Sequence, residues 1–88
     1  MKYSVAISKQ AEKDLKNIDK YQSKLIVNWL YANIEQCTDP RIHGKALTGD
    51  LGGFWRYRVG KYRIICEIDD NKLIVVTINI GHRRDIYR

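Results

Sequence analysis

The sequence predicts an α+β fold in which a two-helix hairpin packs on one face of a mostly antiparallel, four-stranded sheet. Three observations predict it. Apolar residues recur at helical spacing after a short first strand, three strand-like runs fill the second half, and two-residue turn signals separate those runs. The predicted element order is therefore β-α-α-β-β-β. Because the chain has 88 residues and neither a repeat nor a linker, we expect one domain over residues 1–88.

The first half of the chain is predicted to contain one strand and both helices. Residues 2–7 alternate as a short strand, and Ser8 is a suitable cap for the helix that follows. A break near Asp19 separates this helix from a second one. Pro40 lacks an N–H and disfavours helix at Asp39, so Asp39-Pro40 is expected to end the second helix. The predicted apolar stripes are Ala11, Leu15 and Ile18 in the first helix and Leu25, Ile26, Trp29, Leu30, Ile34 and Cys37 in the second.

The second half is predicted to form three strands joined by hairpins. Residues 41–53 contain several glycines and are expected to be an irregular connection. Gly60-Lys61 and Asp70-Asn71 are both good two-residue hairpin signals. The three strands are expected over residues 54–59, 62–69 and 72–80.

The first hairpin is expected to gather three arginines on one face of the sheet. A two-residue loop at Gly60-Lys61 would pair Arg58 with Arg63, and side-chain alternation then places Arg56 beside them. Like charges directly across a ladder destabilise it by a few tenths of a kcal/mol or more. A bound anion would relieve this repulsion, and the guanidinium fork grips phosphate. We therefore predict that Arg56 and Arg58 bind a phosphate-containing substrate together with Arg63.

The overall charge also points to a polyanionic partner. The chain has 16 Lys and Arg against 10 Asp and Glu, a net charge of +6, which suits nucleic acid, an acidic protein or an anionic membrane. No apolar run approaches the ~20 residues that span a bilayer, so we expect no membrane partner. Cys37 and Cys66 have neither CxxC nor histidine spacing. We expect a reduced, buried pair in a cytoplasmic protein with no metal site and no cofactor.

The C-terminal segment carries groups that could act on RNA. Residues 81–88 contain one imidazole, three guanidiniums and a phenol. Metal-free RNA cleavage uses the 2′-hydroxyl of the substrate as nucleophile, so the protein has to stabilise the phosphorane charge and move protons. The arginines supply the first function, and His82 can supply the second near neutral pH. Tyr87 could stack on a base.

Two segments together resemble the RelE branch of the RelE/ParE toxin superfamily. They are residues 53–64, GFWRYRVGKYRI, and residues 81–87, GHRRDIY. The resemblance covers essentially the whole chain. It implies a bacterial or archaeal toxin of a type II toxin–antitoxin module, which enters the ribosomal A site and cuts mRNA there, leaving a 2′,3′-cyclic phosphate. It also implies a cognate antitoxin that wraps the toxin and, in complex with it, binds operator DNA and represses their operon.

Carried over by position, the resemblance gives roles to individual residues. Arg63 matches the arginine that stabilises the transition state, Arg83 an arginine near the leaving group, and Tyr87 a tyrosine that orients the substrate. Two other arginines, Arg56 and Arg58, fall where well-known members have lysines. Because arginine stays charged and is a poor base, we expect proton abstraction to shift to His82, with Tyr87 as the lesser candidate.

Two other functions are compatible with this fold, because fold alone does not determine function. A ParE-like inhibitor of DNA gyrase would bind a protein target and need not cut RNA. A non-catalytic nucleic-acid-binding module would bind RNA and DNA alike, with strong salt dependence. The tail of His82, Arg83 and Tyr87 favours the nuclease. The sequence leaves open whether the antitoxin binds the helical pair or a sheet edge.

Overall fold

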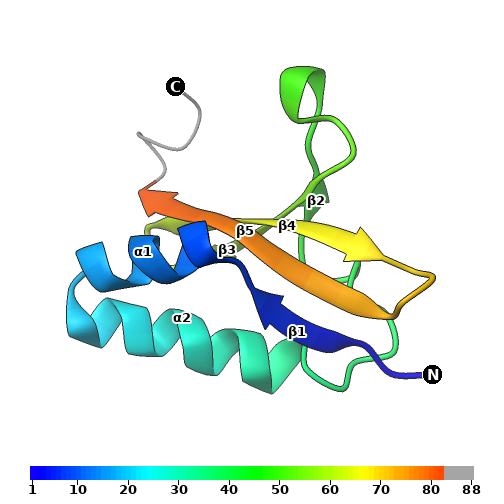
Figure 1. Cartoon of the computed structure of the whole chain (residues 1–88), viewed down its shortest axis with the longest axis horizontal. Coiled ribbons are helices and arrows are strands. Elements are labelled where there is room, and N and C mark those ends of the chain that lie inside the picture. Colours follow the sequence, from blue (N-terminus) through cyan, green and yellow to red (C-terminus); the bar gives the residue numbers. More distant parts are fainter. Residues whose placement is uncertain (83–88) are drawn as a thin grey trace.

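In the computed structural model, which describes residues 1–82, two helices lie on one side of a twisted five-stranded sheet (Figure 1). The sheet order is β1-β5-β4-β3-β2, with β1 parallel to β5 and the other neighbours antiparallel. The predicted fold class is confirmed. Neither helix of this part of the chain has the length and apolar content needed to cross a membrane. The elements are β1 (Ser4–Ile7), α1 (Lys9–Asn17), α2 (Lys20–Asn33), β2 (Lys45–Ala46), the 3₁₀ helix η1 (Gly49–Leu51), β3 (Trp55–Val59), β4 (Tyr62–Asp69) and β5 (Ile74–His82).

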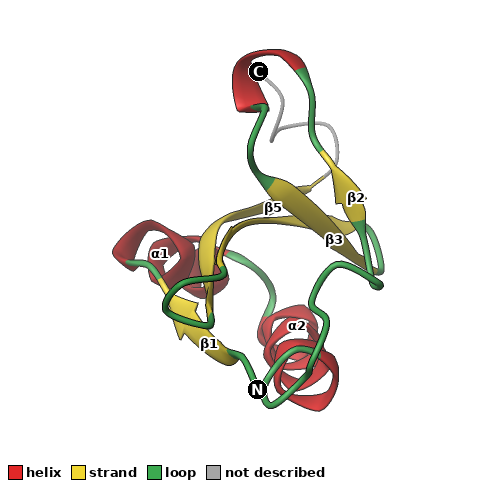
Figure 2. Cartoon of the chain, turned by 90° about the vertical axis from the view of Figure 1, so that its right-hand side faces the viewer, coloured by secondary structure: helices red, strands yellow, loops and turns green. Residues whose placement is uncertain are grey.

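The sheet has one strand more than the four that were predicted. The fifth strand, β2, lies within residues 41–53, which were expected to be irregular throughout. It consists of two residues that pair antiparallel with β3, and two residues are too few to give a recognisable alternation in sequence. The loop between β2 and β3, which contains η1, projects beyond the sheet on the side away from the helices (Figure 2).

The second helix ends earlier than predicted. It stops at Asn33, with Ile34 as its C-cap, so Asp39-Pro40 does not end it. The chain turns at Gln36, whose φ is 68°, and runs back along β1. The backbone N–H of Gln36 donates to the Tyr3 carbonyl, and the Tyr3 N–H donates to the Cys37 carbonyl, at 2.8 and 2.9 Å. These long-range hydrogen bonds to the edge strand replace the last helical turn.

The two hairpins differ in how well they were predicted. The Gly60-Lys61 turn has two residues, because Val59 pairs with Tyr62. The second turn spans residues 70–73 rather than Asp70-Asn71, since β4 ends at Asp69 and β5 begins at Ile74. The Asp69 carboxylate accepts hydrogen bonds from the backbone N–H groups of residues 71 and 72 at 3.0 Å and so builds the longer turn.

The core lies between the helices and one face of the sheet. Burial raises the pKa of the Cys66 thiol to about 12, which makes it an inert core group. The Tyr57 ring is fully buried, and its hydroxyl donates to the Pro40 carbonyl at 2.6 Å. Leu25, predicted to belong to the apolar stripe of α2, is 40% exposed. The cluster of buried side chains is Tyr3, Ala11, Ile26, Leu30, Ile34, Tyr57, Ile64, Cys66, Val75 and Ile80.

A polar network fastens the connection after α2 to the turn between β4 and β5. The Arg41 guanidinium donates to both carboxylate oxygens of Asp70, at 3.0 and 2.9 Å, and the Tyr3 hydroxyl donates to the same carboxylate at 2.6 Å. Hydrogen bonds from Arg41 and then from Tyr3 lower the pKa of Asp70 below its ordinary value of 3.8. The folded protein therefore holds this carboxylate ionised more firmly than the unfolded chain does.

This network predicts an acid-dependent contribution to stability. The contribution is present above the unfolded pKa of Asp70 and is lost as the pH falls through the lower folded pKa. We expect Asp70→Asn to melt at a lower temperature than wild type at pH 7, and the difference to shrink towards zero near pH 2. Thermal melts at both pH values measure it. Asp50→Asn, which removes an exposed carboxylate from η1, is the control. An unchanged difference at both pH values would contradict the prediction.

Candidate functional site

The three arginines of the predicted site lie together on the open face of the sheet, by which we mean the face turned away from α1 and α2. Arg58 pairs directly with Arg63 across the β3–β4 hairpin, as predicted from the two-residue turn. Arg56 lies two residues before Arg58 in β3, so its side chain is on the same face. The intervening Tyr57 and its partner Ile64 are fully buried on the helix side. The prediction of a shared arginine face is therefore confirmed.

The structure adds a fourth cation to this face. Lys45 of β2 pairs with Arg56 of β3, so their side chains share a face, and Lys45 is exposed. Two like-charged cross-strand pairs, Lys45–Arg56 and Arg58–Arg63, thus stand next to each other. We call these four residues the basic cluster. Lys45 lies in the glycine-rich connection and outside the predicted site, although its charge suits the RNA backbone. The two residues of β2 are too few to give an alternation that would predict which face Lys45 occupies.

The backbone at Gly44 fixes the position of β2. A Cβ atom at Gly44 would overlap the Arg56 carbonyl oxygen and lie 2.7 Å from the Trp55 indole nitrogen. A larger residue would therefore push β2 away from β3. Glycine allows the close approach that places Lys45 opposite Arg56.

The arginine stems are anchored against the sheet. The Nε atoms of Arg56 and Arg63 are both buried, although the two residues are partly exposed as a whole. Ile65, which pairs with Arg56 on the open face, is 4% exposed. Anchored stems leave the terminal guanidinium nitrogens as the groups presented to a ligand. They also reduce the side-chain entropy that is lost when an anion binds.

A small hollow lies beside the Arg58–Arg63 pair. It has a volume of about 110 Å³ and is lined by Arg58, Gly60, Lys61 and Arg63. The chain can turn this tightly because Gly60 has a φ of 59°. No carboxylate within residues 1–82 forms an ion pair with Lys45, Arg56 or Arg58. The basic cluster therefore has the charge and the donors that a phosphodiester requires.

His82 does not lie over the arginines, and this part of the predicted geometry is wrong. It pairs with Tyr62, and the two rings meet edge to face with centroids 5.9 Å apart. Tyr62 shares the helix-facing side of β4 with Ile64, so His82 lies on that side too. There it borders a hollow of about 350 Å³ with Asp14, Asn17, Ile18, Asp19, Tyr62, Ile80 and Gly81.

The physical reason is the alternation of side chains along β5. Gly81, which pairs with Arg63, is the residue that faces the open side. The signal was present in the sequence, because Ile80 is apolar and lies two residues before His82. Continuing the last predicted strand from residue 80 to residue 82 would have placed the imidazole on the core side.

Arg83 and Tyr87, the other two predicted catalytic residues, lie outside the described residues. Their roles in placing the leaving group and orienting the substrate stay predictions.

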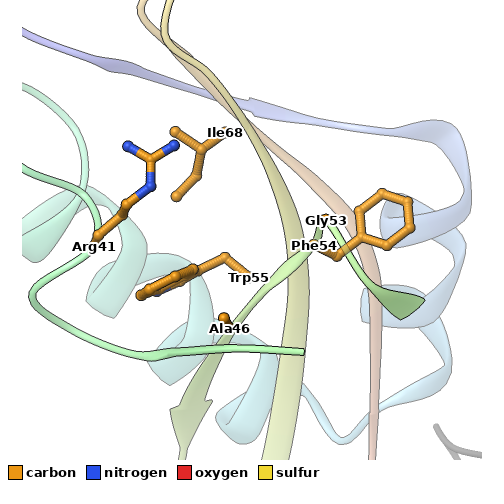
Figure 3. A pocket seen from close by; sticks show the side chains of 6 residues that line it. All are labelled: Arg41, Ala46, Gly53, Phe54, Trp55 and Ile68. Carbon is orange, nitrogen blue, oxygen red and sulfur yellow. The ribbon is translucent and has the colours of Figure 1, made fainter. Parts of the chain in front are cut away.

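Another pocket lies on the other side of β3 from the Arg58–Arg63 hollow and is chemically different. It has a volume of about 210 Å³ and is lined by Arg41, Ala46, Gly53, Phe54, Trp55 and Ile68 (Figure 3). Trp55 and Ile68 point into it beside Arg41, whereas Phe54 points away on the opposite side of the strand (Figure 3). Asp70 already binds the Arg41 guanidinium. With its cation paired and its walls largely apolar, this pocket is less suited to phosphate than the basic cluster.

Comparison with known proteins finds relatives over nearly the whole chain. Residues 5–87 match the family described as the ParE toxin of the type II toxin–antitoxin system parDE. The chain is 32% identical over 88 residues to Toxin RelG of Mycobacterium tuberculosis, covering 100% of this chain and 99% of that protein. It is 33% identical over 86 residues to Toxin RelE of the same organism, covering 98% and 87%. A chain of the toxin–antitoxin complex RelBE2 from this organism superposes with a TM-score of 0.85 at 28% identity, covering 94% of this chain and 100% of that chain.

Proposed function

Because this chain belongs to the RelE/ParE superfamily of type II toxin–antitoxin toxins, we propose that it is a metal-independent endoribonuclease that cuts mRNA on the ribosome and so inhibits translation. The observation that carries the proposal is the Arg58–Arg63 pair on the open face. Like charges directly opposed across a ladder repel each other, and a phosphodiester bound between the two guanidiniums would offset that repulsion.

The proposed reaction uses the nucleophile of the RNA itself. The 2′-oxygen attacks the adjacent phosphorus, the bond from phosphorus to the 5′-oxygen breaks, and the products end in a 2′,3′-cyclic phosphate and a 5′-hydroxyl. One proton leaves the 2′-hydroxyl and one is gained by the departing 5′-oxygen. Negative charge grows on the phosphoryl oxygens in the transition state, and Arg63 with Arg58 would stabilise it. DNA lacks the 2′-hydroxyl and would not be cut.

The location of His82 predicts a weaker role in cleavage than the composition of residues 81–88 suggested. Because its ring lies beside Tyr62 on the helix-facing side, we expect His82→Gln to lower cleavage much less than Arg63→Gln does. Single-turnover cleavage of ribosome-bound mRNA measures both variants. Equal losses would show that the imidazole reaches the reacting atoms and would restore it as the proton acceptor. If His82→Gln retains most of its activity, Tyr87 is the remaining predicted proton acceptor, and Tyr87→Phe tests it in the same assay.

One experiment separates the proposed nuclease from its rivals. Purified protein is incubated with a defined mRNA, with and without programmed ribosomes, and the cleavage sites and end groups are mapped. We expect cleavage on the ribosome that leaves 2′,3′-cyclic phosphates and is blocked by a 2′-O-methyl group at the cut nucleotide. Intact mRNA together with inhibited gyrase supercoiling would favour the ParE-like alternative. Salt-sensitive binding to RNA and DNA alike, without cleavage, would favour a binding module.

We also propose a cognate antitoxin as protein partner. A related chain is found in a toxin–antitoxin complex, and the basic cluster suits an acidic segment that folds on binding. The outer edge of β1 is poorly available for strand addition, because Glu35 accepts the Val5 N–H at 2.7 Å and residues 36–37 bond to Tyr3. We therefore place the antitoxin over the basic cluster, and we propose that the complex, not the toxin alone, binds operator DNA.

A further inference from the structure

We propose that Lys45 and Arg56 form a second phosphate-binding subsite, which holds the phosphodiester next to the one that is cut. The inference rests on the proposed ribonuclease function and extends it, because it fixes the path of the RNA backbone along β3. The first subsite is the Arg58–Arg63 pair.

The register of the sheet sets the spacing of the two subsites. Arg56 and Arg58 occupy successive positions on the same face of β3, about 6.8 Å apart along the strand, which is close to the spacing of neighbouring phosphates in an extended single strand of RNA. Their partners Lys45 and Arg63 lie on the two flanking strands, so the centres of the two pairs are also offset by about 4.8 Å across the sheet. Within each pair the Cβ atoms of directly opposed residues lie about 4.5–5.5 Å apart, so two cationic side chains can reach one phosphate.

The absence of carboxylate partners among the described residues indicates that Lys45 and Arg56 bind an anionic ligand rather than stabilise the fold. The Arg41 guanidinium shows how a structural cation is handled in this protein, since Asp70 binds it with two hydrogen bonds. No carboxylate within residues 1–82 does the same for Lys45 or Arg56. Gly44 holds β2 tightly against β3, so the two cations stay opposed despite their repulsion. Two repelling charges that the backbone already holds together are preorganised for an anion, because little further conformational entropy is lost when the anion binds.

The test combines a protein substitution with a substitution in the RNA. Synthetic mRNAs carry one neutral methylphosphonate, either immediately 5′ or immediately 3′ of the cut phosphate, in the ribosomal A site. With wild-type protein, we expect one of these positions to lower kcat/KM about tenfold. With Lys45→Gln, we expect a similar loss on normal mRNA and little further loss from that methylphosphonate, because the contact is already absent.

Matched variants separate charge from fold. Lys45→Arg keeps the charge and should retain most of the activity. Lys72→Gln removes the same charge outside the basic cluster, in the exposed turn before β5, and should behave as wild type. In binding to a single-stranded RNA, Lys45→Gln should reduce the slope of log K against log salt concentration by about 0.7, the value for one lost phosphate contact.

The outcomes distinguish this inference from the proposed function. If wild type cuts mRNA but Lys45→Gln shows the full methylphosphonate penalty at both positions, the second subsite is wrong and the nuclease stands. If Lys45→Gln and Lys72→Gln lose activity equally, Lys45 contributes only general charge and the subsite is again wrong. If wild type cuts no RNA at all, both the function and the subsite are wrong.

Discussion

Arg63→Gln is expected to slow mRNA cleavage by about 10²–10³-fold, the loss typical of removing one donor that stabilises transition-state charge. Arg63 faces Arg58 across the hairpin and borders the hollow beside the turn, and the family resemblance gives it the role of stabilising the transition state. Glutamine keeps a planar, hydrogen-bonding side chain and loses the positive charge. Single-turnover rates on programmed ribosomes measure the chemical step, and the loss should appear in kcat.

The control for this prediction is a conservative replacement. Arg63→Lys keeps the charge but offers a point ammonium in place of the guanidinium fork, so it should recover part of the rate. Circular dichroism and thermal melting check that both variants fold. A rate for Arg63→Gln within threefold of wild type, with the fold intact, would exclude Arg63 from the proposed reaction.

Leu30→Ala is expected to destabilise the protein by about 2–5 kcal/mol, the range for removing a fully buried leucine. Leu30 is 0% exposed and lies on the face of α2 that packs against the sheet. Its loss removes apolar burial and leaves a cavity between the two layers. A domain of this size has only about 5–15 kcal/mol of stability in total. Urea denaturation should therefore show a midpoint lowered by more than about 1 M.

Leu25 provides a matched control on the same helix. Leu25→Ala makes the same chemical change at a position that is 40% exposed, so it should cost less than about 1 kcal/mol. Similar midpoints for the two variants would mean that α2 packs on the sheet through a different face from the one described. Leu30 lies in the core on the helix side of the sheet, whereas the basic cluster lies on the open face. The fraction of Leu30→Ala protein that remains folded should therefore still bind RNA.

Local sequence signals were sufficient to predict several elements and one strand register. Period-two alternation and the two-residue turn at Gly60-Lys61 fixed the β3–β4 register, and with it the shared face of Arg56, Arg58 and Arg63. The Ser8 cap and the break at Asp19 are also set by neighbouring residues: the Ser8 hydroxyl accepts the Ala11 N–H, and Asp19 accepts the Gln22 N–H. Each of these features depends on residues within a few positions of each other.

Other features depend on partners that are distant in the sequence, so local signals could not predict them. The early end of α2 depends on hydrogen bonds between residues 36–37 and Tyr3, which directly precedes β1, and β2 forms because its two residues pair with β3. That register places Lys45 in the basic cluster. His82 lies on the opposite face from the cluster because β5 continues two residues further along β4 than its sequence pattern indicated. A strand of two residues, and the end of a longer one, are stabilised by pairing across the sheet rather than by propensity, and such pairing leaves little trace in the local sequence.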